Sequence, residues 1–430
     1  MAKLNAPKGT RDFYPDAMRR RRYLEDVWRR VSLRAGFEEV DGPVFESLDL
    51  YVQKSGEEIV GQLYNFEDKG GRAVAIRPEF TPTLARMVVA RQAALPKPVR
   101  WFNISRVCRY ERAQKGRLRE FFQWNCDILG AGGPLADAEC IAVAVDALRE
   151  LRLTPDEVEV RLSSRMLLAA MLKRIGINEE TIPQVYLCLD KRGKAPDDVV
   201  EKMLDDLSIT ADQRRAIDEL STLRSPDEIP NRLREDESVR DATHHLDVVM
   251  WKLKDIGAAE FVRFDIGIVR GLAYYTGPVW EVFEKRGELR SLFGGGRYDT
   301  LIEACGGKPM PACGFGAGDV TMSLLLDQLD RWPEPAGRPE FYVATADGGS
   351  SAEALLVVRR LREASRSAVY ALSEEGFNRQ VKNAASAGVS YLVIVGTTGR
   401  ALGPVRLRDV ATGRESNLSV EELLNLPPPP

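Results

Sequence analysis

The clearest pattern in the sequence is a strict alternation of apolar and polar residues between Phe122 and Ile128. The apolar positions are Phe122, Trp124, Cys126 and Ile128, and the polar positions between them are Gln123, Asn125 and Asp127. Because successive side chains of a β-strand point to opposite faces, this period of two predicts a strand with one face in the core. The other face carries two amides and a carboxylate, so it either lines a polar pocket or faces water.

A helical period appears on both sides of this strand. Between residues 17 and 35 the apolar positions form one stripe, made of Leu24, Val27, Trp28 and Val31, and Gly36 supplies a stop signal. Residues 37–44 predict a strand that Gly42-Pro43 interrupts, and residues 137–150 predict a second amphipathic helix.

The middle of the chain has a different composition. Residues 166–255 are rich in Asp, Glu, Lys, Arg and Leu and contain few strand signals, which predicts a small helical insertion. Residues 261–268 alternate again and predict a strand, and glycine-rich blocks follow it. Residues 331–339 are dense in proline and predict a linker.

Beyond this linker, strands alternate with helices. The strands are predicted at 341–344, 368–372 and 391–395, and the first helix between them has Ser350 and Glu353 in capping-box spacing. Such βαβ alternation predicts a compact parallel or mixed α/β domain.

Composition narrows the class of protein. At 430 residues the chain exceeds the usual size of a single core, so two or three domains are expected. Hydrophobic residues make up 44% and charged residues 29%, as in globular proteins. The sequence contains no run of about 18 apolar residues and no apolar N-terminal stretch of the secretory type. We therefore expect no membrane contact and a cytoplasmic location, or an organelle whose targeting leader has been removed.

The net charge is −3, which argues against a surface coated in positive charge. A nucleic-acid partner would then be held by local basic patches, such as residues 19–22 or the loop at 115–119. Arginines at 19–22 also fit the simpler interpretation of a solvated helix face.

Cysteine and histidine positions do not suggest a catalytic centre. The six cysteines form no CxxC pair and lie mostly in apolar surroundings, which predicts reduced core residues. The two histidines, His244 and His245, are adjacent, so they point to different sides of a helix or strand and are poorly placed to share a metal. The pattern therefore disfavours a zinc site, a serine triad and a cysteine protease.

A charged segment precedes the alternating strand. In a first strand-like run, Arg109 and Glu111 fall on one face. The loop that joins this run to the alternating strand contains Arg112, Lys115, Arg117 and Arg119. Because guanidinium and ammonium groups suit phosphate oxygens, the residues alone predict an anion-binding hairpin beside a hydrogen-bonding pocket.

Residues 109–123 read RYERAQKGRLREFFQ and resemble motif 2 of the class II aminoacyl-tRNA synthetases. The form R-Y-E-R-x-Q-x-G-R-x-R-x-F-x-Q is similar to that of the histidyl-tRNA synthetase family. Five more blocks agree with that family in the expected order, namely KGTRD at 8–12, RPEFT at 77–81, RGLAYY at 270–275, GGGRYD at 294–299 and a glycine-rich block at 311–318. The resemblance thus covers essentially the whole chain.

The resemblance implies an α+β fold with the antiparallel sheet core of a class II synthetase, flanked by helices. It implies a catalytic domain at 1–325 that the helical insertion at 166–255 interrupts, a linker at 326–339 and an α/β anticodon-binding domain at 340–426. The N-terminal helix and strand resemble motif 1, which builds the homodimer interface of class II enzymes.

The implied reaction has two steps. ATP activates L-histidine to histidyl-adenylate with release of pyrophosphate, and the histidine is then transferred to the 3′ end of tRNA(His) with release of AMP. ATP is the implied cofactor, with Mg²⁺ accompanying it, and no residue is assigned to a metal.

The resemblance also assigns site residues. Catalysis is assigned to Arg109 and Arg270, which would act at the α-phosphate. The implied ATP-binding set is Arg109, Glu111, Arg117, Arg270, Gly294, Gly295, Gly296, Gly316 and Gly318. The implied histidine-binding set is Glu79, Thr81, Arg109, Gln123, Asp127, Arg270, Tyr274 and Tyr275. Within that set Glu79, Thr81 and Gln123 would accept the ammonium group, and Asp127 and Tyr275 would meet the imidazole.

Two of these assignments have alternatives. Arg270, predicted at the end of a strand, would either serve the α-phosphate or form a buried structural ion pair. The glycines at 294–296 would either let the adenylate approach the backbone or form a tight hairpin that needs positive φ.

The sequence departs from the usual family pattern in three places. Asp127 stands where the family more often has Glu, and Ala273 stands where it mostly has Asp. Val320-Thr321 replaces the Glu-Arg of the motif 3 helix, whose arginine usually stacks on adenine and touches the γ-phosphate. At the last two places the chain is similar to a branch that includes archaeal and plant-organelle members.

Two other functions fit parts of the pattern. A noncatalytic paralogue, such as the regulatory subunit of ATP phosphoribosyltransferase, resembles the same catalytic fold but generally lacks a C-terminal domain and an intact motif 2. A tRNA-sensing module without catalysis is favoured only by the missing motif 3 arginine. Because Arg109, Arg117 and Arg270 are present with a C-terminal domain, the pattern favours the enzyme.

Overall fold

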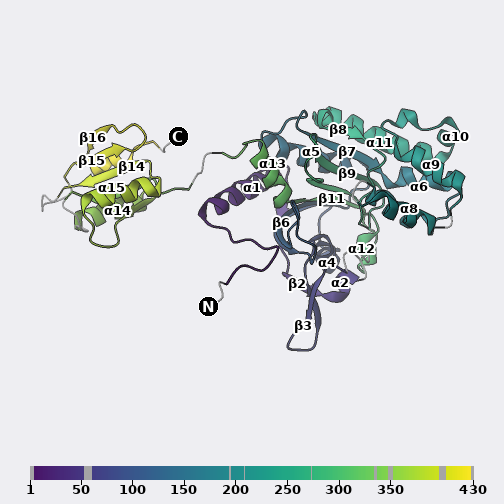
Figure 1. The fold of residues 1–430 in the computed structure, drawn as a ribbon, viewed down its shortest axis with the longest axis horizontal. Helices are drawn as coiled ribbons and strands as arrows, with labels where there is room; N and C mark the ends of the chain where they lie inside the picture. Colours follow the sequence, from purple (N-terminus) through teal and green to yellow (C-terminus); the bar gives the residue numbers. More distant parts are fainter. Residues whose placement is uncertain are drawn as a thin grey trace. The chain divides into compact units, whose positions relative to one another are not determined.

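The computed structural model describes residues 4–52, 61–192, 195–207, 209–272, 274–333, 337–346, 352–396 and 403–427. The chain divides into two compact units, Met1–Trp332 and Pro333–Pro430, and each is described by itself (Figure 1). In the part of the chain that the structure describes, no helix is long and apolar enough to cross a membrane.

An eight-stranded sheet organises the first unit, with its strands in the order β1-β5-β6-β11-β10-β9-β7-β8. Their bounds are β1 Glu38–Glu39, β5 Val99–Cys108, β6 Glu120–Leu129, β7 Val158–Ser164, β8 Val262–Phe264, β9 Pro278–Glu284, β10 Phe293–Arg297 and β11 Ala312–Gly318. Neighbouring strands from β5 to β7 pair antiparallel, and the edge pairs β1·β5 and β7·β8 are parallel. The predicted α+β fold class with an antiparallel sheet core is confirmed.

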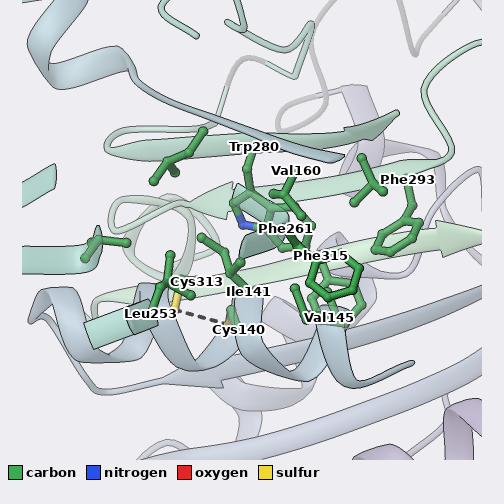
Figure 2. Close-up of a cluster of buried hydrophobic side chains, with 14 of the residues drawn as sticks. Cys140, Ile141, Val145, Val160, Leu253, Phe261, Trp280, Phe293, Cys313 and Phe315 are labelled. Carbon is green, nitrogen blue, oxygen red and sulfur yellow. Dashed lines mark hydrogen bonds between the residues drawn. The ribbon is translucent and has the colours of Figure 1, made fainter. Parts of the chain in front are cut away.

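The hydrophobic core of this unit lies between the sheet and three helices, α1 Pro15–Arg34, α5 Pro134–Glu150 and α11 Glu237–Ile256. Figure 2 shows Phe315 of β11 packed among Ile141 and Val145 of α5, with Trp280 of β9 close by. α5 contacts α1, α11 and the sheet, and most of its side chains are buried. The prediction of an amphipathic helix here is confirmed, because the positions that are not buried include Glu139, Asp146, Arg149 and Glu150, which form one polar stripe.

The limits of α1 follow from its local sequence. Proline at its first position needs no N–H partner, and Gly36, just beyond the helix, has the left-handed φ of 76° that glycine tolerates. The predicted apolar stripe is buried, and its Trp28 stacks on Trp124 of β6 with ring centroids 5.7 Å apart. The stripe therefore docks the helix on the apolar face of the alternating strand.

A three-stranded sheet, in the order β2-β4-β3, lies beside the N-terminal part of the large sheet. Its elements are β2 Phe45–Ser47, β3 Tyr64–Glu67, β4 Ala73–Ile76 and the adjoining α2 Leu48–Val52, and α4 Thr81–Arg91 and α12 Leu301–Ala304 pack on each other nearby. The strand predicted at 37–44 is mostly wrong, since only Glu38–Glu39 pairs with β5. The ladder ends because the Val40 carbonyl accepts the side-chain amide of Asn103 at 2.7 Å and the Gly42 N–H bonds to the Asp41 carboxylate at 2.8 Å.

Helices follow β7, as predicted for the middle of the chain. They are α6 Arg165–Arg174, α7 Ile182–Lys191, α8 Asp197–Asp205, α9 Ala211–Ser221, α10 Asn231–Arg234 and α11, with short turns η1 Pro226–Glu228 and η2 Ala259–Phe261. A capping box of Thr210 and Gln213 starts α9, and Gly257 at φ 81° ends α11. The exact bounds proposed for the insertion stay a prediction.

The strand predicted at 261–268 is shorter in the structure. β8 ends at Phe264, and the chain turns at Asp265, whose carboxylate accepts the Gly267 N–H at 3.2 Å. Arg270 consequently lies in a loop, with φ 58°, and its predicted position at a strand end is wrong.

The second unit is a five-stranded mixed sheet in the order β13-β12-β14-β15-β16. Its strands are β12 Phe341–Thr345, β13 Ala368–Tyr370, β14 Tyr391–Val395, β15 Val405–Asp409 and β16 Glu415–Leu418, and its helices are α14 Ala352–Glu363, α15 Phe377–Ala387 and α16 Val420–Leu424. α14 and α16 cover one face and α15 covers the other. The predicted mixed α/β domain is confirmed, whereas the proposed cap at Ser350 lies outside the described residues.

Candidate active site

A cavity of about 1000 Å³ opens beside the polar face of β6 in the first unit. It brings together most of the predicted site residues, which are far apart in the sequence: Glu79, Thr81, Arg109, Glu111, Arg117, Gln123, Asp127, Arg270, Tyr274, Tyr275, Gly294, Gly316 and Gly318. Gly295 and Gly296 do not line it.

The polar face of β6 is buried against alternate glycines of β11. In the strand register Gly314 lies opposite Asp127, Gly316 opposite Asn125 and Gly318 opposite Gln123. A Cβ on Gly314 would stand 2.1 Å from Oδ1 of Asp127, and one on Gly316 would stand 2.7 Å from Nε2 of Gln123. The glycines thus leave room for the polar side chains. The polar face of β6 was predicted either to line a polar pocket or to face water, and it lines a pocket.

Asp127 is a buried polar group that lines the cavity. Its side chain is buried, and Tyr298 donates its hydroxyl hydrogen bond to Oδ1 at 2.5 Å. Burial raises the pKa of Asp127 to about 7, the hydrogen bond from Tyr298 opposes that rise, and the nearby charge of Glu79 adds to it. A carboxylate in this position is poised to accept a hydrogen bond from a cationic or N–H-bearing ligand.

Glu79 lies on the same side of the cavity, just before α4. It is buried, and its Oε2 accepts a hydrogen bond from the Tyr274 hydroxyl at 3.0 Å. Thr81 is the first residue of α4 and lines the cavity beside it. Together with Asp127 and the Gln123 amide, these groups make one end of the cavity rich in hydrogen-bond acceptors.

Arg270 pairs with a residue that the sequence did not single out. Its Nη1 lies 2.8 Å from Oε1 of Glu281 on β9, and its Nη2 donates to the Gly294 carbonyl at 3.4 Å. Both charged side chains are at least four-fifths buried, with 17% and 9% of their surface exposed, and both line the cavity. The ion pair that was left open as an alternative for Arg270 therefore exists, but it lies inside the cavity.

A second arginine holds the loop that carries Arg270. Arg165, at the start of α6, is buried and donates to the carbonyl oxygens of Val269, Tyr275 and Arg270 at 2.8, 3.1 and 2.5 Å. Three fixed carbonyls restrain the backbone of a loop in which Arg270 adopts a left-handed φ that non-glycine residues rarely take.

Arg109, Glu111 and Arg117 form another end of the cavity. β5 ends at Cys108, so the prediction that Arg109 and Glu111 share a strand face is wrong. The ladder to β6 stops because the Arg119 N–H bonds to the Gly9 carbonyl and the Tyr110 N–H to the Gln62 carbonyl, although the Arg109 N–H still bonds to the Arg119 carbonyl in register. Arg109 donates through Nε to the Pro78 carbonyl at 2.9 Å, and Arg117 pairs with Glu111 at 2.6 Å.

The KGTRD block at 8–12 and the start of α13 Asp319–Gln328 anchor this segment. The Gly9 carbonyl accepts the Arg119 N–H at 2.8 Å. Arg11 pairs with the buried Asp319 at 2.7 Å, and Asp319 also accepts the Phe122 N–H at 2.9 Å. Three blocks that are separate in the sequence are thus tied together at the base of the loop.

The glycines at 294–296 belong to β10 and are extended, so the tight-hairpin alternative is wrong. A Cβ on Gly294 would stand 2.3 Å from the Trp280 carbonyl and 2.8 Å from Nη1 of Arg270. A Cβ on Gly295 would stand 2.3 Å from the Gly314 carbonyl. Close approach explains the run, and for Gly295 the approaching group is the neighbouring strand β11.

The part of the chain that the structure describes holds no group of three or more His, Cys, Asp or Glu residues that could bind a metal ion. His245 instead contacts buried Asp137, with 3.0 Å between Nε2 and Oδ2.

All six cysteines are free thiols. The arginines at 19–22 each pair with a nearby carboxylate. Arg20 and Arg22 are exposed, as a solvated helix face predicts, whereas the Arg21 side chain is mostly buried and lies over the ring of Phe122.

Sequence reasoning missed several residues of the site. Glu281 and Arg165 carry no local signal, because each is defined by a partner on another element. Tyr298 lay within a glycine-rich block but was assigned no role, and Arg290 lines the cavity although the sequence gave it no distinction. Asn125 could have been found, since it lies on the predicted polar face of β6.

Comparisons with known proteins agree on one family. The family model described as histidyl-tRNA synthetase matches residues 9–320, and the model described as anticodon binding domain matches residues 340–426. Among curated proteins, the chain is 38% identical to the histidine–tRNA ligase of Opitutus terrae, with 98% of each chain covered. It is 41% identical to that of Natronomonas pharaonis, covering 96% of this chain and 95% of the relative. It is 37% identical to the chloroplastic/mitochondrial histidine–tRNA ligase of Arabidopsis thaliana, covering 98% of this chain and 86% of the relative.

Solved structures share the fold. The histidyl-tRNA synthetase of Nostoc sp. PCC 7120 superposes with a TM-score of 0.81 at 23% identity, covering 98% of this chain and 99% of that one. The apo histidyl-tRNA synthetase of S. aureus gives a TM-score of 0.73 at 21% identity, covering 98% and 99%.

Proposed function

Because the chain belongs to the histidyl-tRNA synthetase family, we propose that its cavity binds L-histidine at the Asp127 end and ATP at the Arg117 end. The activity that family membership gives the chain is histidine–tRNA ligation, a class II aminoacyl-tRNA synthetase reaction that uses ATP, histidine and tRNA. The family and this activity, both predicted from the sequence, are confirmed.

The observation that carries the placement of substrates is the separation of charge along the cavity. Asp127 lies close enough to Glu79 for their charges to interact, and Gln123 lies on the same face of β6 as Asp127. Arg109 and Arg117 form a second group with Arg290 and with Glu111, which pairs with Arg117. The negative charge of Asp127 acts on the nearby hydroxyl of Tyr275. The ring of Tyr275 contacts Arg270, and Arg270 pairs with Glu281. Arg270 thus stands between the two ends, where a carboxylate and an α-phosphate would meet.

Histidine suits the acceptor end for chemical reasons. Its ammonium group needs several acceptors, which Glu79, Thr81 and Gln123 would supply, and its imidazole N–H would bond to Asp127. Tyr298 would keep the Asp127 carboxylate in place by its hydrogen bond, and Tyr274 would do the same for Glu79. A ligand without this N–H pattern would leave buried polar groups unpaired, so the pocket would reject it.

The chemistry requires little more than position and charge. A carboxylate oxygen of histidine attacks the α-phosphorus of ATP, the bond from that phosphorus to the bridging oxygen breaks, and pyrophosphate leaves with the electron pair. Arg270 and Arg109 would offset the negative charge that accumulates at the α-phosphate. The ribose hydroxyl at the tRNA 3′ end then attacks the histidyl carbonyl, loses its proton, and AMP leaves.

Mg²⁺ is proposed to enter with ATP. The carboxylates near the arginines, Glu111 and Glu281, are each paired with a guanidinium, so phosphate oxygens and water would supply most of the ligands of the ion. Bound there, the ion would neutralise phosphate charge.

Histidine-dependent exchange of pyrophosphate into ATP tests the proposal in one assay. We expect exchange that requires L-histidine and is not supported by other amino acids, because adenylate formation is reversible and the acceptor end is specific. The two alternatives, a noncatalytic paralogue and a tRNA-sensing module, both predict no exchange. Absence of exchange with folded protein would therefore contradict the proposed site.

The second unit is proposed to bind the anticodon region of tRNA(His). We expect that removing residues 338–430 leaves histidine-dependent exchange near its full rate, because every residue proposed to contact histidine or ATP lies in the first unit. The KM for tRNA in aminoacylation should rise about tenfold or more, the equivalent of roughly 1.4 kcal/mol of lost contact energy. Its dependence on salt should also weaken, because fewer phosphates are contacted.

Exchange by the truncated protein serves as the control for its folding. Aminoacylation that is equal for the two proteins at limiting tRNA would reject the anticodon-binding role of the second unit.

A homodimer formed through the first 50 residues is also proposed, as the motif 1 resemblance implies. Leu33, Val44 and Phe45 in this segment are exposed apolar side chains, with 56%, 52% and 56% of their surface accessible, and such residues suit a subunit contact. A cytoplasmic location remains a prediction.

A further inference from the structure

A third arginine lies at the phosphate end of the cavity. Arg290 lines the cavity together with Arg109 and Arg117, but it comes from the loop between β9 and β10, whereas they come from the segment between β5 and β6. Arg117 pairs with Glu111, and Arg270 pairs with Glu281. Within the described residues no carboxylate forms an ion pair with Arg290, so its guanidinium group is available to a ligand.

The loop that carries Arg290 is fixed at both ends. The buried carboxylate of Glu284 accepts the N–H groups of Arg286 at 2.9 Å and Leu289 at 2.8 Å, and also that of Glu288. Beyond Arg290, the Leu292 carbonyl accepts the Thr321 hydroxyl of α13 at 2.9 Å. These bonds hold a surface loop in one conformation, so the arginine is presented at a defined place.

The loop that carries Arg117 lies directly against Arg290. A Cβ on Gly116 would stand 3.6 Å from Cγ and Cδ of Arg290 and 3.2 Å from Cγ2 of Thr321. Gly116 adopts φ 76° at the turn immediately before Arg117. The stem of Arg290 therefore lies against the backbone that immediately precedes Arg117.

The guanidinium groups of Arg290, Arg117 and Arg109 lie close enough to repel one another. Neighbouring protein atoms displace part of the water around Arg290, whose side chain remains exposed, and lower its pKa. The positive charges of Arg117 and Arg109 lower the pKa further, and the carboxylates of Glu111 and Glu281 oppose them. Such an arrangement has an electrostatic cost in the ligand-free protein, which a ligand with several negative charges would offset. A triphosphate is the substrate of this reaction with that property.

We propose that Arg290 binds the β- and γ-phosphates of ATP beside Arg117 and stabilises the departing pyrophosphate. As the bond at the α-phosphorus breaks, negative charge grows on the pyrophosphate oxygens, and a fixed guanidinium group there stabilises that charge. The inference rests on the ATP site proposed above. In this proposal the loop between β9 and β10 supplies a guanidinium group to the terminal phosphates. Thr321, which stands at the position of the absent motif 3 arginine, holds that loop in place through its hydrogen bond to the Leu292 carbonyl.

The role of Arg290 at the terminal phosphates can be tested by calorimetry, which measures how tightly the variants Arg290→Met and Arg286→Met bind AMP, ADP and ATP. Arg286 lies in the same loop and is exposed, but it does not line the cavity, which makes it the matched control. We expect Arg290→Met to leave AMP affinity unchanged and to weaken ATP about 10- to 100-fold, the loss of a charge-assisted hydrogen bond. Arg286→Met should bind all three nucleotides as the unmodified protein does, and Arg290→Lys should recover part of the loss.

Exchange kinetics give a second readout. In Arg290→Met the KM values for ATP and pyrophosphate should rise while the KM for histidine stays constant, a division that a merely structural change would not produce.

Three results would overturn the proposal. Equal loss of AMP and ATP affinity would place Arg290 at the nucleoside or in the fold. Unchanged ATP affinity with a raised KM for tRNA would assign it to a tRNA phosphate. If the unmodified protein bound ATP no more tightly than AMP, the proposed ATP site itself would fail, and that result is distinguishable because it needs no variant.

Discussion

Arg270→Ala should lower the rate of histidyl-adenylate formation roughly 10²–10³-fold, the size of effect seen when one fixed donor to developing charge is removed. Arg270 lines the cavity over the ring of Tyr275, and its backbone is restrained by Arg165. Its charge would act mainly in the transition state, so histidine affinity should change far less than the rate. Pyrophosphate exchange and direct titration with histidine measure the two quantities separately.

The ion pair with Glu281 requires a control. Removing Arg270 leaves a carboxylate with only 9% of its side chain exposed and no partner, which by itself destabilises a protein. The double variant Arg270→Ala/Glu281→Gln removes that unpaired charge. If it remains as slow as the single variant, the lost rate reflects the missing positive charge, whereas recovery to the original rate would show that Arg270 is structural.

Asp127→Asn should weaken histidine binding about 10- to 100-fold and leave ATP affinity unchanged. The amide keeps the size of the side chain and can still accept the Tyr298 hydroxyl, which in the structure bonds Oδ1. It loses a charge-assisted hydrogen bond to the imidazole, worth about 1.5–3 kcal/mol. Calorimetric titration with each substrate checks the result, and an equal loss of ATP affinity would show that Asp127 does not serve the imidazole.

The raised pKa of Asp127 adds a pH dependence to this prediction. Its value of about 7 means that the ligand-free carboxyl is increasingly protonated below pH 7, so histidine affinity should fall there by up to about tenfold per pH unit. Asp127→Asn should lack this component, while the ionisations of histidine itself affect both proteins alike. Parallel pH profiles for the two proteins would contradict the assignment.

The same pKa predicts a stability effect of known sign. The folded pKa of about 7 lies above the ordinary 3.8, so between these values the folded protein binds more protons than the unfolded chain. The contribution of Asp127 to stability is therefore fully present below pH 3.8 and is lost as pH rises towards 7. Thermal unfolding of Asp127→Asn should lack this decline.

The sequence predicted elements best where a local period and its stop signals agree. The alternation from Phe122 to Ile128 gave the two faces of β6 correctly, and the strand predicted at 391–395 matches β14 residue for residue. The prediction was wrong where the hydrogen-bond partner of a segment changes along the chain. β5 ends before Arg109 because the Arg119 N–H turns to the Gly9 carbonyl and the Tyr110 N–H to the Gln62 carbonyl, which no local pattern reveals.

In the site, too, some features were visible in the sequence and others only in the tertiary structure. Polar residues of β6 and the alternate glycines of β11 were both visible in the sequence, but only the register that sets Gly314 opposite Asp127 explains why they occur together. The glycines at 294–296 illustrate the reverse case, since for Gly295 the close approach foreseen for the adenylate is made by β11.

By itself, the sequence determined the family, the sheet-based fold class and the residues that carry charge, because these depend on residue types at fixed spacings along one chain. Only the tertiary structure decided that Arg270 pairs with Glu281, that Arg165 restrains its loop, and that Arg290 joins Arg117. Each of these depends on strand register and on which loops meet at one cavity. The free energy of such contacts depends on the distance between the groups and on their burial. The residues next to them in the sequence determine neither quantity.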